Sequence, residues 1–210
     1  MPRSARRVFA AVLAAGESRR MGRVKPLLPW GETTILGQIL HNLLASQVGE
    51  VWVVTGFEAG AVGAVAADFG ARVLFNPSYA SGEMLSSLQV AVRALPARCS
   101  GVLVVLADQP LIPTAIFDQV IAAFDDDQER IVAPTYKGQR GHPVLIGRRF
   151  FAELLGLAPG SAPRDLLQAH EAAFHLLAVE SEAVLLDLDR PGEYERYRPR
   201  QAGEEPDAEP

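Results

Sequence analysis

Residues 12–30, "VLAAGESRRMGRVKPLLPW", lead an apolar strand pattern directly into a loop that is rich in glycine and positive charge. Glycine allows the backbone to approach a bound anion closely and to turn successive N–H groups toward it. Arg20 and Lys25 add positive charge to this loop, and an arginine can hold two phosphate oxygens at once. The stretch is therefore suited to holding phosphate at the end of a strand, although a solvated basic loop would have the same composition.

The spacing of this loop differs from the two common nucleotide-binding loops. A P-loop requires G-x4-G-K-[ST], whereas here Lys25 falls three residues after Gly22. A dinucleotide loop requires G-x-G-x-x-G leading directly into a helix, whereas this loop continues through "KPLLPWGETT". By spacing alone, the loop is either a phosphate site of another type or a solvated surface loop.

The rest of the chain repeats a short β-branched run followed by a helical pattern, which predicts an α/β fold. Runs such as "GVLVVLA" (101–107) are apolar throughout, as in strands of a mostly parallel sheet that is covered on both faces. We expect a doubly wound sheet with helices on both faces and ligands beyond the carboxyl ends of its strands. "TYKGQRGHPVLIG" (135–147) predicts an inserted β-hairpin. The expected strands are 8–13, 50–55, 71–75, 101–107, 130–135, 143–146, 173–179 and 183–186, and the expected helices are 33–46, 59–69, 82–94, 114–124, 148–155 and 164–169.

Composition limits the classes of function. The net charge of −5 owes much to the last eight residues, "GEEPDAEP", which carry four acids and no base. The remainder is close to neutral, which argues against a nucleic-acid partner. The single cysteine, Cys99, excludes an internal disulfide and a thiolate metal cluster and fits a reducing compartment. We expect a single domain over residues 1–198, followed by a disordered acidic tail over 199–210.

The sequence also bears on location. It contains no run of 18 apolar residues, so we expect no membrane span and no membrane partner. The apolar run at 8–15 follows basic residues, as in a signal peptide, but it is short and ends in "GESRRMG", a poor cleavage context. We therefore interpret this run as a buried strand and expect a cytoplasmic protein.

Five segments, which together span residues 8 to about 196, resemble the nucleotidyltransferases with the MobA-like, Rossmann-like fold. The opening loop resembles their signature L-A-A-G-x-S-x-R-M-G-x-x-K. These enzymes transfer a nucleoside monophosphate from an NTP to a phosphorylated acceptor and release pyrophosphate. The other four segments follow in the family's order: "NPSYASGEMLSSL" (76–88), "LADQPLI" (106–112), "RGHPVLI" (140–146) and "LLDLDRPGEYER" (185–196).

Within this family, three triplets are similar to the molybdenum cofactor cytidylyltransferases: Ala14-Ala15-Gly16, Asp108-Gln109-Pro110 and Gly141-His142-Pro143. The resemblance implies a Mg²⁺-dependent transfer of CMP from CTP to the terminal phosphate of Mo-molybdopterin. It also implies a molybdoenzyme or its chaperone as the recipient of the product. The alternatives are another nucleotide, a sugar or alcohol phosphate acceptor, or a non-catalytic carrier of molybdenum cofactor. Residues 160–164, "GSAPR", lack the acidic residue of the family's Gly-Asp-x-Gly loop, so the acceptor side departs from the family pattern.

Two carboxylates are the candidate metal ligands. Asp108 follows the apolar run "VLVVLA" and is expected at the carboxyl end of a buried strand, where a carboxylate can bind Mg²⁺ beside phosphates. The second ligand would come from "DLD" (187–189). Asp189 is preferred, because Asp187 can instead cap a turn at the end of the preceding strand.

The resemblance assigns the remaining site residues. Lys25 is assigned to the triphosphate and Arg20 to the leaving pyrophosphate, as the fixed cations of the signature. His142 is assigned to the acceptor. Ser86 is favoured over its neighbour Ser87 for contact with the cytosine edge. The expected nucleotide-binding residues are Leu13, Ala14, Ala15, Gly16, Lys25, Gly82 and Ser86.

Overall fold

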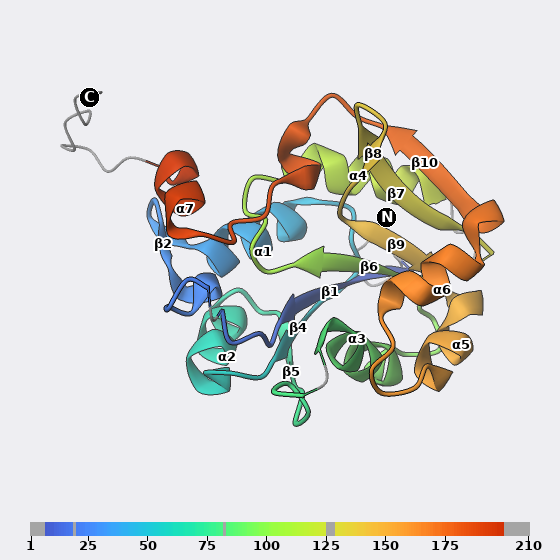
Figure 1. Ribbon diagram of the computed structural model, residues 1–210, viewed down its shortest axis with the longest axis horizontal. Coiled ribbons are helices and arrows are strands. Elements are labelled where there is room, and N and C mark those ends of the chain that lie inside the picture. The colour runs from blue at the N-terminus through green and yellow to red at the C-terminus, as the bar shows by residue number, and fades with distance from the viewer. Residues whose placement is uncertain (1–6, 19, 82, 125–128, 200–210) are drawn as a thin grey trace.

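The computed structural model describes residues 7–18, 20–81, 83–124 and 129–199. An eight-stranded sheet forms its centre, with strand order β10-β7-β9-β6-β1-β4-β5 and with β8 paired to β7 (Figure 1). The strands β1, β4, β5 and β6 are mutually parallel, and β10 is parallel to β7, whereas β9 is antiparallel to both of its neighbours. The strands are β1 (Val8–Ala14), β4 (Val51–Thr55), β5 (Arg72–Phe75), β6 (Gly101–Leu106), β7 (Ile131–Tyr136), β8 (Gln139–Arg140), β9 (Val144–Gly147) and β10 (Phe174–Ala178).

Two apolar cores lie on opposite faces of the sheet. Alternate residues of a strand point to opposite faces, and β1 supplies Val12 to one core and Ala11 to the other. The first core includes α1, α2 and α4, and the second includes α3, α5 and α6, which gather on one side of the sheet in Figure 1. The helices are α1 (Ile35–Ala45), α2 (Ala59–Asp68), α3 (Glu83–Ala94), α4 (Thr114–Phe124), α5 (Phe151–Gly156), α6 (Pro163–Ala169) and α7 (Pro191–Tyr197).

The order of the strands reverses between β1 and β6. From β1 the chain continues outward to β4 and β5, and it then returns to place β6 on the other side of β1. In open α/β sheets, the crevice beyond such a reversal is where ligands bind. The ends of β1 and β6 therefore mark the place to look for a site.

The α/β class, the mostly parallel sheet and the helices on both faces are confirmed. The hairpin is present as β7 and β8, which pair antiparallel through Thr135 with Arg140 and Tyr136 with Gln139. Within the described ranges, no helix has both the length and the apolar character needed to cross a bilayer. The proposed acidic tail, apart from residue 199, lies outside the described residues.

One expected strand is wrong. Residues 183–186 were predicted as a strand, but Glu182–Leu185 form a 3₁₀ helix. The N–H of Leu186 donates to the carbonyl of Ala183 at 3.3 Å, and this bond between residues three apart closes a helical turn. The side chain of Ser181 accepts a hydrogen bond from the backbone N–H of Ala183 and caps the turn.

Two of the expected helices also differ from the structure. The helix predicted from residue 33 begins at Ile35, because Thr33–Thr34 form β3 and pair with β2 (Pro29–Trp30). The side chain of Thr34 then caps α1 by accepting a hydrogen bond from the N–H of Gly37. The helix predicted over 148–155 is divided into a 3₁₀ turn, Arg148–Phe150, and α5.

Candidate active site

A cavity of about 320 Å³ lies beyond the carboxyl ends of β1 and β6. One wall is formed by the end of β1 and the loop that follows it, and another by the residues directly after β6. Tyr79, Met84 and Ser87 also line the cavity. Six of the residues assigned from the sequence are in the lining: Leu13, Ala14, Ala15, Gly16, Lys25 and Asp108.

The backbone at the end of β1 is fixed by a close approach to the turn after β4. The carbonyl of Ala15 accepts a hydrogen bond of 3.1 Å from the N–H of Phe57. A Cβ on Gly56 would lie 2.7 Å from the same carbonyl and 2.4 Å from the Cβ of Tyr79. Because residue 56 is a glycine, Tyr79 can pack against the turn after β4, close to the end of β1. Tyr79 thereby forms part of the cavity wall.

The basic loop is folded back on itself by Ser18, which the sequence analysis did not single out. Ser18 has a φ of +53°, and its carbonyl accepts a hydrogen bond from the N–H of Met21. Its hydroxyl accepts a second hydrogen bond, 3.1 Å long, from the N–H of Lys25. Lys25 then begins the 3₁₀ turn Lys25–Leu27. The serine of the signature thus places the backbone of the signature lysine.

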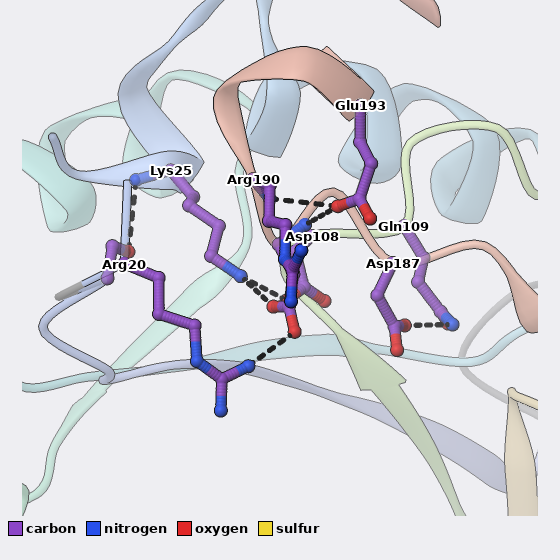
Figure 2. A network of polar contacts seen from close by, with 9 residues as sticks. Arg20, Lys25, Asp108, Gln109, Asp187, Arg190 and Glu193 are labelled. Atoms are coloured by element: carbon purple, nitrogen blue, oxygen red, sulfur yellow. Dashed lines mark hydrogen bonds and ion pairs between the residues drawn. The ribbon is translucent and has the colours of Figure 1, made fainter. Parts of the chain in front are cut away.

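Four charged side chains meet at one side of the cavity (Figure 2). The Nζ of Lys25 lies 2.8 Å from Oδ2 of Asp108 and 2.6 Å from Oδ1 of Asp189. A guanidinium nitrogen of Arg20 lies 2.9 Å from Oδ2 of Asp189. Lys25 is nearly buried, with 11% of its side chain exposed, whereas 76% of the Arg20 side chain is exposed. The two cations and two carboxylates assigned from the sequence are therefore in mutual contact.

The protonation states in this cluster follow from these contacts. Burial lowers the pKa of Lys25, but the charge of Asp108 and the hydrogen bonds to both carboxylates outweigh it and hold the pKa above its ordinary value. The hydrogen bond from Lys25 holds the pKa of Asp189 below its ordinary range, against the opposing effect of burial. Lys25 and Asp189 are therefore both charged at neutral pH.

Asp187 has a different environment from Asp189. Its Oδ1 accepts a hydrogen bond of 2.7 Å from Nε2 of Gln109, a side chain that is only 2% exposed. Burial, and then the negative charge of Asp108, raise the pKa of Asp187. Asp189, rather than Asp187, shares a cation with Asp108, which supports the preference for Asp189 as the second carboxylate of the site.

The backbone around Asp189 is held by α7, which the sequence analysis did not predict. Oε2 of Glu193 accepts hydrogen bonds from the N–H groups of Asp189 at 2.7 Å and Arg190 at 2.8 Å. The hydroxyl of Tyr194 donates to the carbonyl of Pro29 at 2.7 Å. The local signal was Pro191 followed by Glu193, a combination typical of the first turn of a helix.

The serine pair lies at the beginning of α3. The hydroxyls of Ser86 and Ser87 both accept hydrogen bonds from Nδ2 of Asn76, at 2.8 and 3.0 Å. Of the two serines, Ser87 lines the cavity, although Ser86 is the one favoured from the sequence. Gly82, which was assigned to the same edge of the nucleotide, lies outside the described residues.

His142 lies between β8 and β9, close to the 3₁₀ helix Glu182–Leu185. The backbone N–H of His142 donates to the carbonyl of Val184 at 2.9 Å. A Cβ on Gly141 would lie 2.2 Å from that same carbonyl oxygen. Burial lowers the pKa of the His142 ring, although the charge of Asp108 acts in the opposite direction. Nδ1 is buried and has no hydrogen-bond partner among the described residues. The ring is therefore a neutral group within electrostatic reach of Asp108.

The two carboxylates fit a divalent ion of the Mg²⁺ type. Asp108 and Asp189 already direct one oxygen each at a single cation, the ammonium of Lys25, which lies between them. In the described part of the chain, no group of three or more His, Cys, Asp or Glu side chains is arranged to hold a metal. Mg²⁺ is commonly held by one or two carboxylates, with water and substrate phosphates as the other ligands. The donor set therefore suits an ion that is bound together with phosphate.

A second, larger hollow of about 620 Å³ lies beside this cluster. Asp187 and Asp189 line it together with residues of α7, and the lining has mixed charge, with Glu193 beside Arg190 and Arg196. Asp189 therefore belongs to the charged cluster and also borders an open surface of mixed charge.

Comparison with known proteins identifies a family and several relatives of this chain. The sequence profile of a family described as "MobA-like NTP transferase domain" matches residues 10–173. The molybdenum cofactor cytidylyltransferase of Escherichia coli is 27% identical over 89% of this chain and 95% of its own length. The nicotine blue oxidoreductase of Paenarthrobacter nicotinovorans is 30% identical over 87% of this chain and 92% of its own length. The crystal structure of Rv0371c from Mycobacterium tuberculosis H37Rv in complex with manganese has a TM-score of 0.75 and 30% identity, covering 91% of this chain and 97% of that one.

Proposed function

The chain belongs to the MobA-like NTP transferase family and is a nucleotidyltransferase, and from that premise we propose that it transfers CMP from CTP to the terminal phosphate of Mo-molybdopterin. The products would be molybdopterin cytosine dinucleotide and pyrophosphate. The observation that carries the proposal is the contact of Lys25 with both Asp108 and Asp189 at the side of the cavity. This contact brings the signature lysine together with the two carboxylates that suit a divalent ion.

The reaction requires little covalent work from the protein. An oxygen of the acceptor phosphate forms a bond to the α-phosphorus of CTP, and the bond from that phosphorus to the β-phosphate oxygen breaks. The acceptor phosphate is already ionised at neutral pH, so the protein needs no general base for the attack. Positioning and neutralisation of charge therefore account for most of the catalysis.

Each part of the cavity has a role in this proposal. The backbone of Ala14, Ala15 and Gly16 would lie along the nucleotide, where small residues leave room for it. Lys25 would bind the triphosphate, and Arg20 would neutralise charge that develops on the leaving pyrophosphate. The exposed position of Arg20 leaves it free to reorient toward that group.

Nucleotidyltransferases of this family generally use divalent metals, and we propose Mg²⁺ held by Asp108 and Asp189. When bound, the ion would supply positive charge to the phosphate oxygens. The chain's own contribution is to fix the two carboxylates: Asp108 by its place two residues after the end of β6, and Asp189 through the bonds of Glu193 to its backbone. His142, neutral and within electrostatic reach of Asp108, would face the acceptor.

The proposal is tested by measuring pyrophosphate release with Mg²⁺ and purified Mo-molybdopterin, with CTP compared against GTP, ATP and UTP. We expect release with CTP, and we expect Asp108→Asn to remove most of the turnover while the thermal unfolding curve keeps its shape. The exposed Asp68→Asn variant provides a matched control with the same change in charge. Release with another nucleotide in preference to CTP would refute the donor, whereas CTP binding without release with this acceptor would refute the reaction.

A further inference from the structure

Asn76, directly after β5, is a buried amide whose orientation is fixed. The side chain and backbone together are 1% exposed. The backbone N–H of Asn76 donates to the carbonyl of Thr55 at 2.8 Å. Its side-chain Oδ1 accepts a hydrogen bond from the N–H of Ser78 at 3.0 Å. Because a backbone N–H can only donate, the oxygen of the amide must face Ser78, and Nδ2 must face the opposite way.

The opposite side of the amide faces the serine pair. Nδ2 carries two protons, and it lies 2.8 Å from the hydroxyl of Ser86 and 3.0 Å from the hydroxyl of Ser87. Toward Asn76, both hydroxyl oxygens therefore act as acceptors. A hydroxyl that accepts from one side still has its own proton to donate elsewhere.

Ser87 is the member of the pair that lines the cavity, together with Tyr79 and Met84. Lys25 and Asp108, the charged part of the lining, belong to the loop after β1 and the residues after β6. If Lys25 and Asp108 mark the end of the cavity that holds the triphosphate, the nucleobase would lie against the part of the lining that contains Ser87. Ser87 is 4% exposed, so a base that meets it does so away from bulk water, where an unmatched polar contact is costly.

We propose that Asn76 is a specificity-determining residue: it directs the Ser87 hydroxyl to donate into the cavity and so selects a nucleobase whose edge presents a hydrogen-bond acceptor at that point. This inference rests on the proposed function, because it requires a nucleotide in the cavity. Cytosine has a lone pair on N3, whereas uracil carries a proton there. A base with N–H at that point would set two donors against each other, and such mismatches give strong discrimination.

The test changes the direction of the hydroxyl without changing its position. In Asn76→Asp, the side chain keeps its shape, but a carboxylate accepts hydrogen bonds from both serines, so Ser87 would present lone pairs to the cavity. We expect the ratio of CTP to UTP affinity, measured by calorimetry without any acceptor, to fall by at least about tenfold. Ser87→Ala should reduce the ratio to a similar extent by removing the donor, whereas Ser181→Ala, a capping serine remote in sequence, should leave it unchanged.

A change in the ligand tests the same contact if Asn76→Asp fails to fold. The wild-type protein should bind 3-deaza-CTP, in which C–H replaces N3, about tenfold more weakly than CTP. The Ser87→Ala variant should bind the two nucleotides with similar affinity. A loss of stability alone would lower both affinities and would not alter these ratios.

The outcomes separate this inference from the function on which it rests. Failure of the wild-type protein to bind any nucleotide would refute the proposed function and the inference together. Normal CTP binding with unchanged ratios in folded Asn76→Asp and Ser87→Ala would refute the inference alone. A loss of discrimination in Ser86→Ala but not in Ser87→Ala would also refute it, because Ser86 would then be the serine that contacts the base.

Discussion

Replacing Lys25 by methionine should have opposite effects on the binding of metal and of nucleotide. In the resting protein the Lys25 ammonium occupies the position between Asp108 and Asp189. A divalent ion that binds these carboxylates must therefore displace it. Lys25→Met removes this competitor and should strengthen metal binding, although it also removes a cation that the triphosphate needs.

The size of the effect follows from the contacts that are lost on displacement. A hydrogen bond to a charged group contributes roughly 1.5–3 kcal/mol when well shielded. Of the two carboxylate side chains, Asp189 is 39% exposed and Asp108 is 23% exposed, so the contact with Asp189 is discounted heavily for solvent screening. We therefore expect the competition to cost the wild-type protein about 1–2 kcal/mol, which corresponds to a metal affinity about 5- to 30-fold tighter in Lys25→Met.

The assay is calorimetric titration of Mn²⁺ into the nucleotide-free protein, followed by titration of CTP at saturating Mn²⁺. Arg23→Met is the matched control, because it removes the same charge from an exposed position in the same loop. Mn²⁺ should bind more tightly to Lys25→Met than to Arg23→Met, and CTP should bind more weakly. Equal or weaker binding of Mn²⁺ to Lys25→Met would show that the ammonium does not compete for the metal position.

Three further predictions concern the groups around the site. In Gly141→Ala, the new Cβ would lie 2.2 Å from the carbonyl oxygen of Val184, so we expect a loss of about 2–3 kcal/mol in urea unfolding. Tyr194→Phe removes the hydrogen bond between α7 and β2, so it should cost about 1 kcal/mol in the same assay. The lowered pKa of Asp189 contributes stability that is present above its unfolded value and is lost as pH falls through the folded pKa. The stability difference between wild type and Lys25→Met should therefore shrink as pH is lowered below about 4.

The central strands could be predicted from the sequence because their burial leaves a strong pattern. The core strands β1 and β6 are apolar throughout, and only a sheet covered on both faces accommodates such runs. Placement of Asp108 at the end of β6 followed directly from that pattern. Short elements gave no such signal: α7 has seven residues, which is too few to show helical periodicity, and the apolar run at 183–186 fits a strand or a helical turn equally well.

The sequence predicted which residues belong to the site better than it predicted which of them contact one another. The signature identified Lys25, and strand position identified Asp108, but 83 residues of chain separate the two. A further 81 residues lead from Asp108 to Asp189, which bonds the same ammonium. Such pairings depend on how the sheet and α7 bring distant loops together, which spacing along the chain does not encode. The choice between Ser86 and Ser87 likewise depends on which side of α3 faces the cavity.

Arg20 and Lys25 differ in exposure, and this difference affects how easily each cation can leave its carboxylates to bind a triphosphate. Arg20 forms a largely exposed ion pair, and such pairs contribute about 0–1 kcal/mol, so exchanging Asp189 for a phosphate oxygen costs little. Lys25 is nearly buried between two carboxylates, and its departure would leave two like charges without a counter-ion in a partly desolvated place. Lys25 is therefore released only when another cation replaces it. We expect nucleotide and divalent ion to strengthen each other's binding for this reason, since the ion that neutralises the carboxylates also frees the lysine for the phosphates.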